Sequence, residues 1–227
     1  MPEKDFIVSA DGHVLEPTDL FKTRLPQHLR DRAVWEEDFT LDQPWVEDGA
    51  TIFRRLHTAG YEGWTISRYR QTRGRMPEGD PEHVLEDMDL DGVDVQIMHP
   101  NLSLFGLYSD DHELSIAHAR VYNDYIVERY APHFDRICPT APIPLSDVPD
   151  AVAEIERVAA AGFRAILLPA TPPRSYYTRD LDPVWEAATA AGVQVFFHTQ
   201  TGGVSVNDTQ ATTLKVVHEN AAQVNQP

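Results

Sequence analysis

The chain has 227 residues, 42% of them hydrophobic and 24% charged, which is typical of a globular protein large enough to bury a substantial core. Its formal net charge of -17 would repel phosphate backbones and anionic membrane surfaces, so we expect neither nucleic acid nor membrane as a partner. With one cysteine, Cys138, no signal-peptide pattern and no long apolar run, we expect a cytoplasmic protein without an intrachain disulfide.

The chain opens with a short apolar run, predicted as a strand over residues 5–10, which turns abruptly polar in the stretch DGHVLEP. Residues 17–80 follow and show no clean hydrophobic period, although they hold three tryptophans, several glycines and many charges. We interpret residues 17–80 as a long insertion after the first strand of a single domain that covers residues 1–227.

A pattern of helix, glycine and apolar strand then repeats along the chain. Gly92, Gly162 and Gly192 each follow a helix-like stretch and precede an apolar run, as C-terminal helix stops do. Asp80 and Asp182 each precede a proline, as N-cap residues often do. We predict further strands over 93–98, 136–141, 163–168 and 193–198, and helices over 81–90, 110–131, 147–160, 182–190 and 208–223.

The predicted strands are nearly continuous in apolar residues, which is typical of parallel strands covered on both faces. Strands that alternate with helices indicate an α/β fold. In such folds the chemistry gathers where the strands end at their carboxyl side.

Polar side chains stand at three of these strand ends. Asp11 and His13 follow the first strand and, being two residues apart, would point to the same side. His198 ends the fifth strand and His99 the second. In a closed barrel the first and fifth strands would face each other, so Asp11, His13 and His198 could bind one divalent metal. Taken singly, a strand-end histidine is more often a packing residue, and His99 is as compatible with a loop role as with substrate binding.

Four stretches together resemble a known family, the amidohydrolase-2 group of the amidohydrolase superfamily. They are SADGHVLEP, GVDVQIMHP, DPVWEAATAAGVQVFFH and its continuation HTQTGG, so the similarity runs over essentially the whole chain. The group includes aminocarboxymuconate semialdehyde decarboxylase and aromatic-acid decarboxylases and hydrolases. The resemblance implies a metal-dependent (β/α)8 TIM barrel in which Asp11, His13 and His198 bind the metal and Glu16 has a supporting or catalytic role.

The chain departs from this family pattern in one respect. The family barrel has a further metal-binding aspartate at strand eight and often a catalytic group near strand six, whereas we find about five strand–helix units here. We therefore expect a TIM-barrel fold that is truncated after about five units.

Three further residues are weaker candidates. His218 could approach the site as a catalytic group, although a solvated surface histidine is more common. Arg68 could bind a substrate carboxylate or simply pair with the surplus of acids, and Trp64 could contact an aromatic substrate or pack the insertion down.

The sequence thus favours an enzyme that hydrolyses or decarboxylates a small carboxylate or amide, aromatic substrates included, with one divalent metal. We expect zinc, with manganese as the alternative, and a homodimer. One rival is a catalytically inactive barrel fragment that binds only metal or a partner chain, which a native stop codon after Pro227 would favour. A weaker rival is an open flavodoxin-like sheet, which predicts no metal and leaves Asp11 and His13 unexplained.

Overall fold

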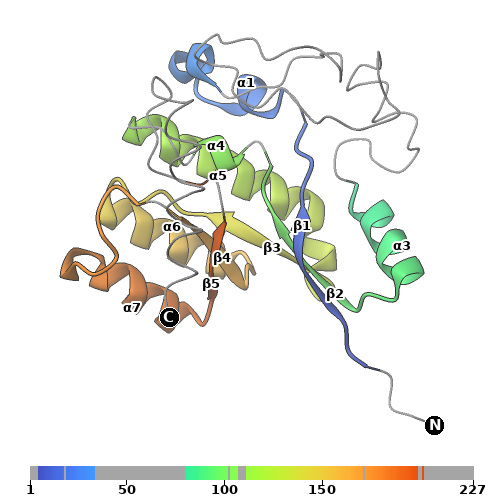
Figure 1. Cartoon of the computed structure of the whole chain (residues 1–227). Coiled ribbons are helices and arrows are strands. Elements are labelled where there is room, and N and C mark those ends of the chain that lie inside the picture. Colours follow the sequence, from blue (N-terminus) through green and yellow to red (C-terminus); the bar gives the residue numbers. More distant parts are fainter. Residues whose placement is uncertain are drawn as a thin grey trace, which may run out of the picture.

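The strands that the structure describes form a single parallel sheet. The computed structural model describes residues 5–17, 19–33, 80–101, 103–106, 111–170, 172–198 and 201. Within this part of the chain, neighbouring strands pair in the order β1-β2-β3-β4-β5, and every pair is parallel. The strands are β1 (Val8–His13), β2 (Val95–His99), β3 (Ile137–Pro142), β4 (Ala165–Pro169) and β5 (Gln194–His198), shown in Figure 1.

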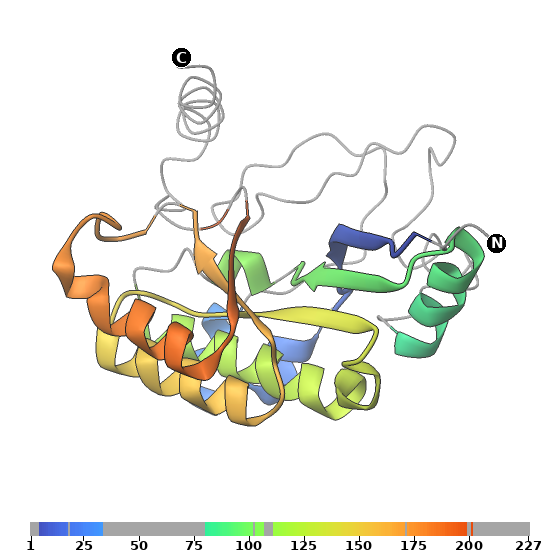
Figure 2. The ribbon, with the colours of Figure 1, turned by 90° about the horizontal axis from the view of Figure 1, so that it is seen from below.

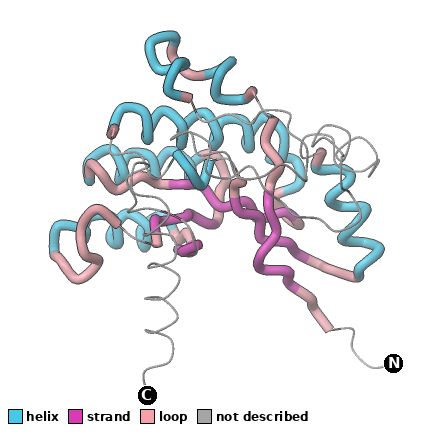
Figure 3. Tube along the Cα trace, turned by 45° about the horizontal axis from the view of Figure 1, so that its top comes forward, coloured by secondary structure: helices cyan, strands magenta, loops and turns pink. Residues whose placement is uncertain are grey.

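Helices connect successive strands and cover the sheet from outside. The longer ones are α3 (Pro81–Asp91), α5 (His112–Tyr130), α6 (Val148–Ala160) and α7 (Asp182–Ala191). The shorter ones are α1 (Leu20–Arg24), η1 (Gln27–Arg32), α4 (Ser103–Gly106), η2 (Ala131–His133) and η3 (Arg179–Leu181). Figure 2 shows α5, α6 and α7 side by side on one face of the sheet, and Figure 3 shows helices outside and strands inside.

The sheet curls into half a barrel. Although β1 and β5 are its opposite edges, the rings of His13 on β1 and His198 on β5 lie only 4.9 Å apart between centroids. A sequential strand order with this curl is the arrangement of a (β/α) barrel, and the described residues contain five of its strands with the helical connections between them. It excludes a flavodoxin-like sheet, in which the first strand would lie inside the sheet rather than at its edge.

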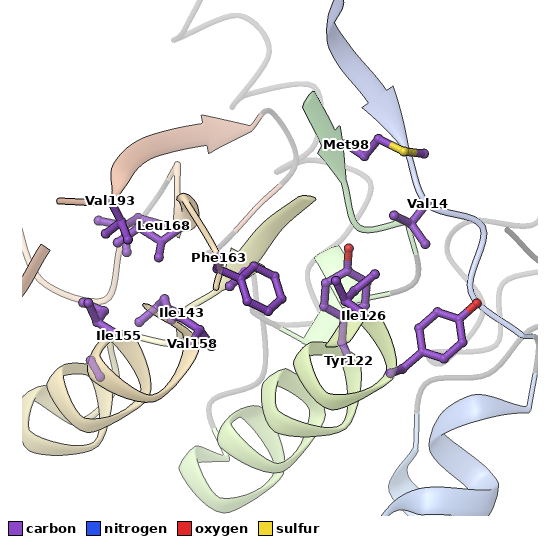
Figure 4. Packing of buried hydrophobic residues seen from close by; sticks show 14 of the residues in the cluster. Val14, Met98, Tyr122, Ile126, Ile143, Ile155, Val158, Phe163, Leu168 and Val193 are labelled. Carbon is purple, nitrogen blue, oxygen red and sulfur yellow. The ribbon is translucent and has the colours of Figure 1, made fainter. Parts of the chain in front are cut away.

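The hydrophobic core lies between the central strands and the helices. Every residue of β4 is buried, which explains its unbroken apolar sequence AILLP. Ile143, Ile155 and Val158 pack near Leu168, while Tyr122 and Ile126 of α5 lie toward Val14 and Met98 (Figure 4).

Some helix ends, but not all, lie where the capping residues in the sequence predicted them. The Asp80 side chain accepts a hydrogen bond from the amide of Glu82 ahead of α3, and Gly92 ends that helix with φ 73°, a backbone conformation that favours glycine. The prediction of Asp182 as an N-cap is wrong. The residues Arg179–Leu181 already form a 3-10 turn that runs directly into α7, so Leu181 takes the cap position and Asp182 is the first helical residue.

Two other predictions need correction. The first strand begins and ends three residues later than the predicted 5–10, because its pairing with β2 continues to the partners His13 and His99. Residues 17–80 also hold regular structure, since α1 and η1 lie within them. Residues 34–79 and the predicted helix over 208–223 lie outside the described residues. Among the helices that are described, none is both long and apolar enough to cross a membrane.

Candidate metal centre

Three predicted metal ligands meet at the carboxyl ends of β1 and β5. His198 Nε2 lies 3.5 Å from an Asp11 carboxylate oxygen, and one ligand atom from each of Asp11, His13 and His198 lies within 4.8 Å of the others. Asp11 is 81% exposed, whereas His198 is only 16% exposed. The curl of the sheet therefore brings two ligands from one edge strand against a third from the other.

The geometry of these three side chains fits a divalent metal. Metal–ligand bonds of about 2.1 Å in tetrahedral directions would separate ligand atoms by roughly 3.4 Å. The separation of 3.5 Å between Asp11 and His198 is close to this value, and the remaining separations are no more than 4.8 Å. One carboxylate and two imidazoles suit zinc or manganese and leave positions for water or substrate.

The ring orientation of His13 is set by a backbone carbonyl. His13 Nδ1 lies 3.0 Å from the Pro100 carbonyl oxygen, just beyond the end of β2. Because a carbonyl only accepts hydrogen bonds, Nδ1 must carry the proton. The lone pair is then on Nε2, which is the arrangement that a metal-binding histidine requires.

His99 lies beneath the candidate metal ligands rather than at the surface. Its ring is buried and lies 5.0 Å from that of His198 and 5.9 Å from that of His13 between centroids. Burial, and then the proximity of His198, lower the pKa of His99. A neutral ring is satisfied here, because Nε2 can donate to the Ala10 carbonyl oxygen and Nδ1 can accept from the Thr140 hydroxyl. In this place His99 can support the rings of His13 and His198. The predicted contact of His99 with substrate stays a prediction.

The end of β5 is tied to the end of β4 by Thr201. The buried Thr201 hydroxyl donates to the backbone carbonyl of His198 and accepts from the amide of Ala170 at 2.8 Å. This link fixes the backbone that carries His198. Thr201 was not predicted as a site residue, because its only signal in the sequence is its place just after a strand-end histidine.

Glu16 is fully buried and is bound to the backbone that follows β2. One carboxylate oxygen accepts from the amides of Asn101 at 3.0 Å and Ser103 at 3.1 Å, and the other lies 3.2 Å from the Asn101 amide. This arrangement is that of a supporting residue, and the predicted catalytic role of Glu16 stays a prediction. The other predicted site residues, Trp64, Arg68 and His218, lie outside the described residues.

A second group of possible ligands lies at the start of α5 and α6. His112, Asp147 and Asp150 also bring ligand atoms within 4.8 Å of one another. Each of them already has a structural contact. His112 bridges the Ser146 hydroxyl at 2.8 Å and Asp150 at 2.7 Å, and Asp147 caps α6 by accepting from the Asp150 amide. We therefore assign this group to helix packing.

Comparison with known proteins identifies the family. The family model described as Amidohydrolase matches residues 11–224. No curated protein matches the sequence significantly. Among solved structures, an amidohydrolase from Mycobacterium avium subsp. paratuberculosis K-10 superposes with a TM-score of 0.59 at 21% identity, over 86% of this chain and 59% of its own.

Two decarboxylases share the same fold. The 2,6-dihydroxybenzoate decarboxylase from Rhizobium has a TM-score of 0.56 at 18% identity, over 92% of this chain and 53% of its own. A dihydroxybenzoic acid decarboxylase from Polaromonas, crystallised with manganese and 2-nitroresorcinol, has a TM-score of 0.54 at 18% identity, over 99% of this chain and 56% of its own. The chain thus spans little more than half the length of these structures.

Proposed function

Because the chain belongs to the amidohydrolase family, we propose that it is a metal-dependent hydrolase or carboxy-lyase that acts on a small carboxylate or amide. Asp11, His13 and His198 would hold one divalent ion. The observation that carries this proposal is the 3.5 Å approach of Asp11 and His198, which come from opposite edges of the sheet. Packing of an apolar core does not require an acid and two histidines at one point, whereas a metal does.

The roles of the individual residues follow from their positions. A bound divalent ion would act as a Lewis acid that polarises an oxygen of the substrate. His13 would offer Nε2 because its Nδ1 is held by Pro100, and His198 would be held in place by Thr201. Asp11 would supply negative charge at the most exposed position of the site. Zinc suits this ligand set, and the manganese in the Polaromonas structure makes manganese the metal to test beside it.

An aromatic carboxylate is the substrate class that we propose to test first. The structures from Rhizobium and Polaromonas are both described as decarboxylases of dihydroxybenzoic acids. Arg68 and Trp64 remain candidates for binding such a carboxylate and its ring, with His99 as a third contact. Glu16 and His218 remain the candidates for catalytic groups.

The experiment is a reaction panel on chain loaded with zinc or manganese. Hydroxybenzoic acids and aromatic amides are supplied separately, and carbon dioxide release and amide hydrolysis are measured. Metal-dependent turnover that His198→Ala abolishes is expected. Turnover that survives in His198→Ala, or that chelation leaves unchanged, would contradict the proposal.

A second candidate function is binding without turnover. Both edge strands of the described half-barrel carry an exposed apolar residue, Val8 on β1 and Phe197 on β5, which a partner chain could cover. This function predicts metal uptake with no reaction for any substrate in the panel. We also propose a homodimer and a cytoplasmic location, neither of which decides between the two functions. A small-molecule substrate is proposed for the enzyme alone.

A further inference from the structure

We infer that Glu16 is a positioning residue that acts through one peptide bond to fix which nitrogen of His13 is free for a metal. The relevant peptide joins Pro100 to Asn101. Its carbonyl oxygen lies 3.0 Å from His13 Nδ1, and its N–H donates to Glu16. Two side chains of the segment that ends β1 thus hold opposite ends of one peptide group.

The rigidity of that peptide group couples the two contacts. A trans peptide is planar, with its carbonyl and its N–H pointing in opposite directions. Holding the Asn101 N–H toward Glu16 therefore directs the Pro100 carbonyl away from Glu16, toward His13. Proline has no N–H of its own, so the peptide on the other side of Pro100 has no amide donor with which to fix this segment.

The environment of Glu16 makes this contact strong and specific. The side chain is fully buried, and its carboxylate accepts from two backbone amides, Asn101 and Ser103. The Glu16 oxygens accept from these N–H donors, whereas a carbonyl turned toward them would place two acceptors against each other. Glu16 thereby holds the peptide between Pro100 and Asn101 with its N–H toward Glu16 and its carbonyl toward His13.

The consequence for His13 is a single tautomer. With the Pro100 carbonyl in place, the proton stays on Nδ1 and the lone pair on Nε2. If the peptide were released, the alternative tautomer with the proton on Nε2 would become populated, and its Nε2 could not bind a metal. Metal-binding histidines commonly donate their second nitrogen to a carboxylate or carbonyl, and here the carboxylate acts one peptide further away.

The test compares two buried glutamates. Glu16→Gln keeps one acceptor oxygen and places an NH2 group against the Asn101 amide, which lies 3.2 Å from the second carboxylate oxygen of Glu16. Glu154→Gln is the matched control, because Glu154 is also fully buried and accepts hydrogen bonds from Asn123 and Arg157, but it joins α5 to α6. The readouts are the His13 tautomer from ring nitrogen NMR shifts, exchange protection of the Asn101 amide, and zinc affinity by calorimetry.

The wild-type chain should show a proton on His13 Nδ1 and a protected Asn101 amide. Glu16→Gln should lose that protection, show a mixed tautomer and bind zinc about 10- to 100-fold more weakly. Glu154→Gln should lower the melting temperature without changing the tautomer. A wild-type proton on Nε2, or a His13 tautomer unchanged in a folded Glu16→Gln variant, would overturn the inference.

A second variant and a readout that does not require metal keep the test decisive. If Glu16→Gln does not fold, Glu16→Asp retains the carboxylate with a shorter reach, and the tautomer and the Asn101 protection should weaken together. A tautomer that stays fixed while Asn101 loses protection would overturn the coupling. Only the zinc measurement rests on the proposed function, so a chain that binds no metal would fail that proposal while the tautomer still decides the role of Glu16.

Discussion

The centre and the edges of the sheet differ in burial and in chemistry. Every residue of β4 is buried, and only Cys138 of β3 is less than fully enclosed. No residue of β1 or β5 reaches that degree of burial, and Val8 and Phe197 on these strands are 47% and 51% exposed. All three candidate metal ligands lie on β1 and β5. The central strands therefore provide stability, while the edge strands provide the site and need the curl of the sheet to meet.

The largest expected effect on the free energy of unfolding comes from removing a buried side chain of the central strands. Ile166→Ala in β4 should lower the free energy of unfolding by about 2–5 kcal/mol, because it removes a fully buried side chain and leaves a cavity. Val8→Ala in β1 should cost less than about 1 kcal/mol, since Val8 is half exposed. Denaturant unfolding of both variants measures the difference, and equal losses would contradict the division between centre and edge.

A second expected effect is a pH dependence of the free energy of unfolding, which arises in a helix that covers the central strands. Burial of His118 on α5 lowers its pKa to about 4. The unfolded chain takes up this proton near pH 6.5, so His118 should destabilise the fold by roughly 1–3 kcal/mol as the pH falls from 6.5 toward 4. Above pH 6.5 it should have no such effect, because the ring is neutral in both states.

The measurement for this effect is the free energy of unfolding at pH 7 and pH 5. His118→Asn keeps a donor for the Leu114 carbonyl that His118 Nδ1 now contacts, and it should show a flatter pH dependence than the wild type. A pH dependence in His118→Asn as steep as that of the wild type would refute the assignment.

The smallest expected effect on stability comes from the edge. Asp11→Asn alters a carboxylate that is 81% exposed, so the free energy of unfolding should change by less than about 0.5 kcal/mol. Zinc affinity should nevertheless fall strongly. Mutation of a residue that only supports a ligand typically lowers metal affinity by about 10- to 100-fold, and the loss of Asp11 as a ligand should exceed that. Calorimetry and unfolding on the same sample test the contrast, and a large loss of stability with unchanged affinity would reverse it.

The alternation of helices and apolar strands was sufficient to predict an α/β fold with five strands, whereas the barrel was predicted from the family resemblance. The first strand was placed too early because the prediction centred on the apolar run Phe6, Ile7 and Val8, whereas the strand follows its pairing with β2 as far as His13. Pairing partners decide strand ends more than local propensity does. The same limit applies at α7, where a preceding 3-10 turn displaced the predicted cap Asp182.

The candidate metal ligands could be predicted because they lie at strand ends. The contacts with the backbone that hold the site together could not. Asp11, His13 and His198 were found from spacing and from family resemblance, and the structure brings them together. The contacts of Glu16 with Asn101 and of Thr201 with His198 link residues whose sequence gives no sign of a partner. A glutamate between apolar residues and a proline, as in VLEP, is the signal that could have indicated a buried acid.

The most direct test of the metal centre is the metal content of purified chain after dialysis against zinc or manganese, measured by mass spectrometry. Wild type and His198→Ala are compared with His112→Ala, which removes a histidine from the group at α5 and α6. We predict about one ion per chain in the wild type and in His112→Ala, and almost none in His198→Ala. Metal retained by His198→Ala, or lost from His112→Ala instead, would contradict a site built on the two edge strands.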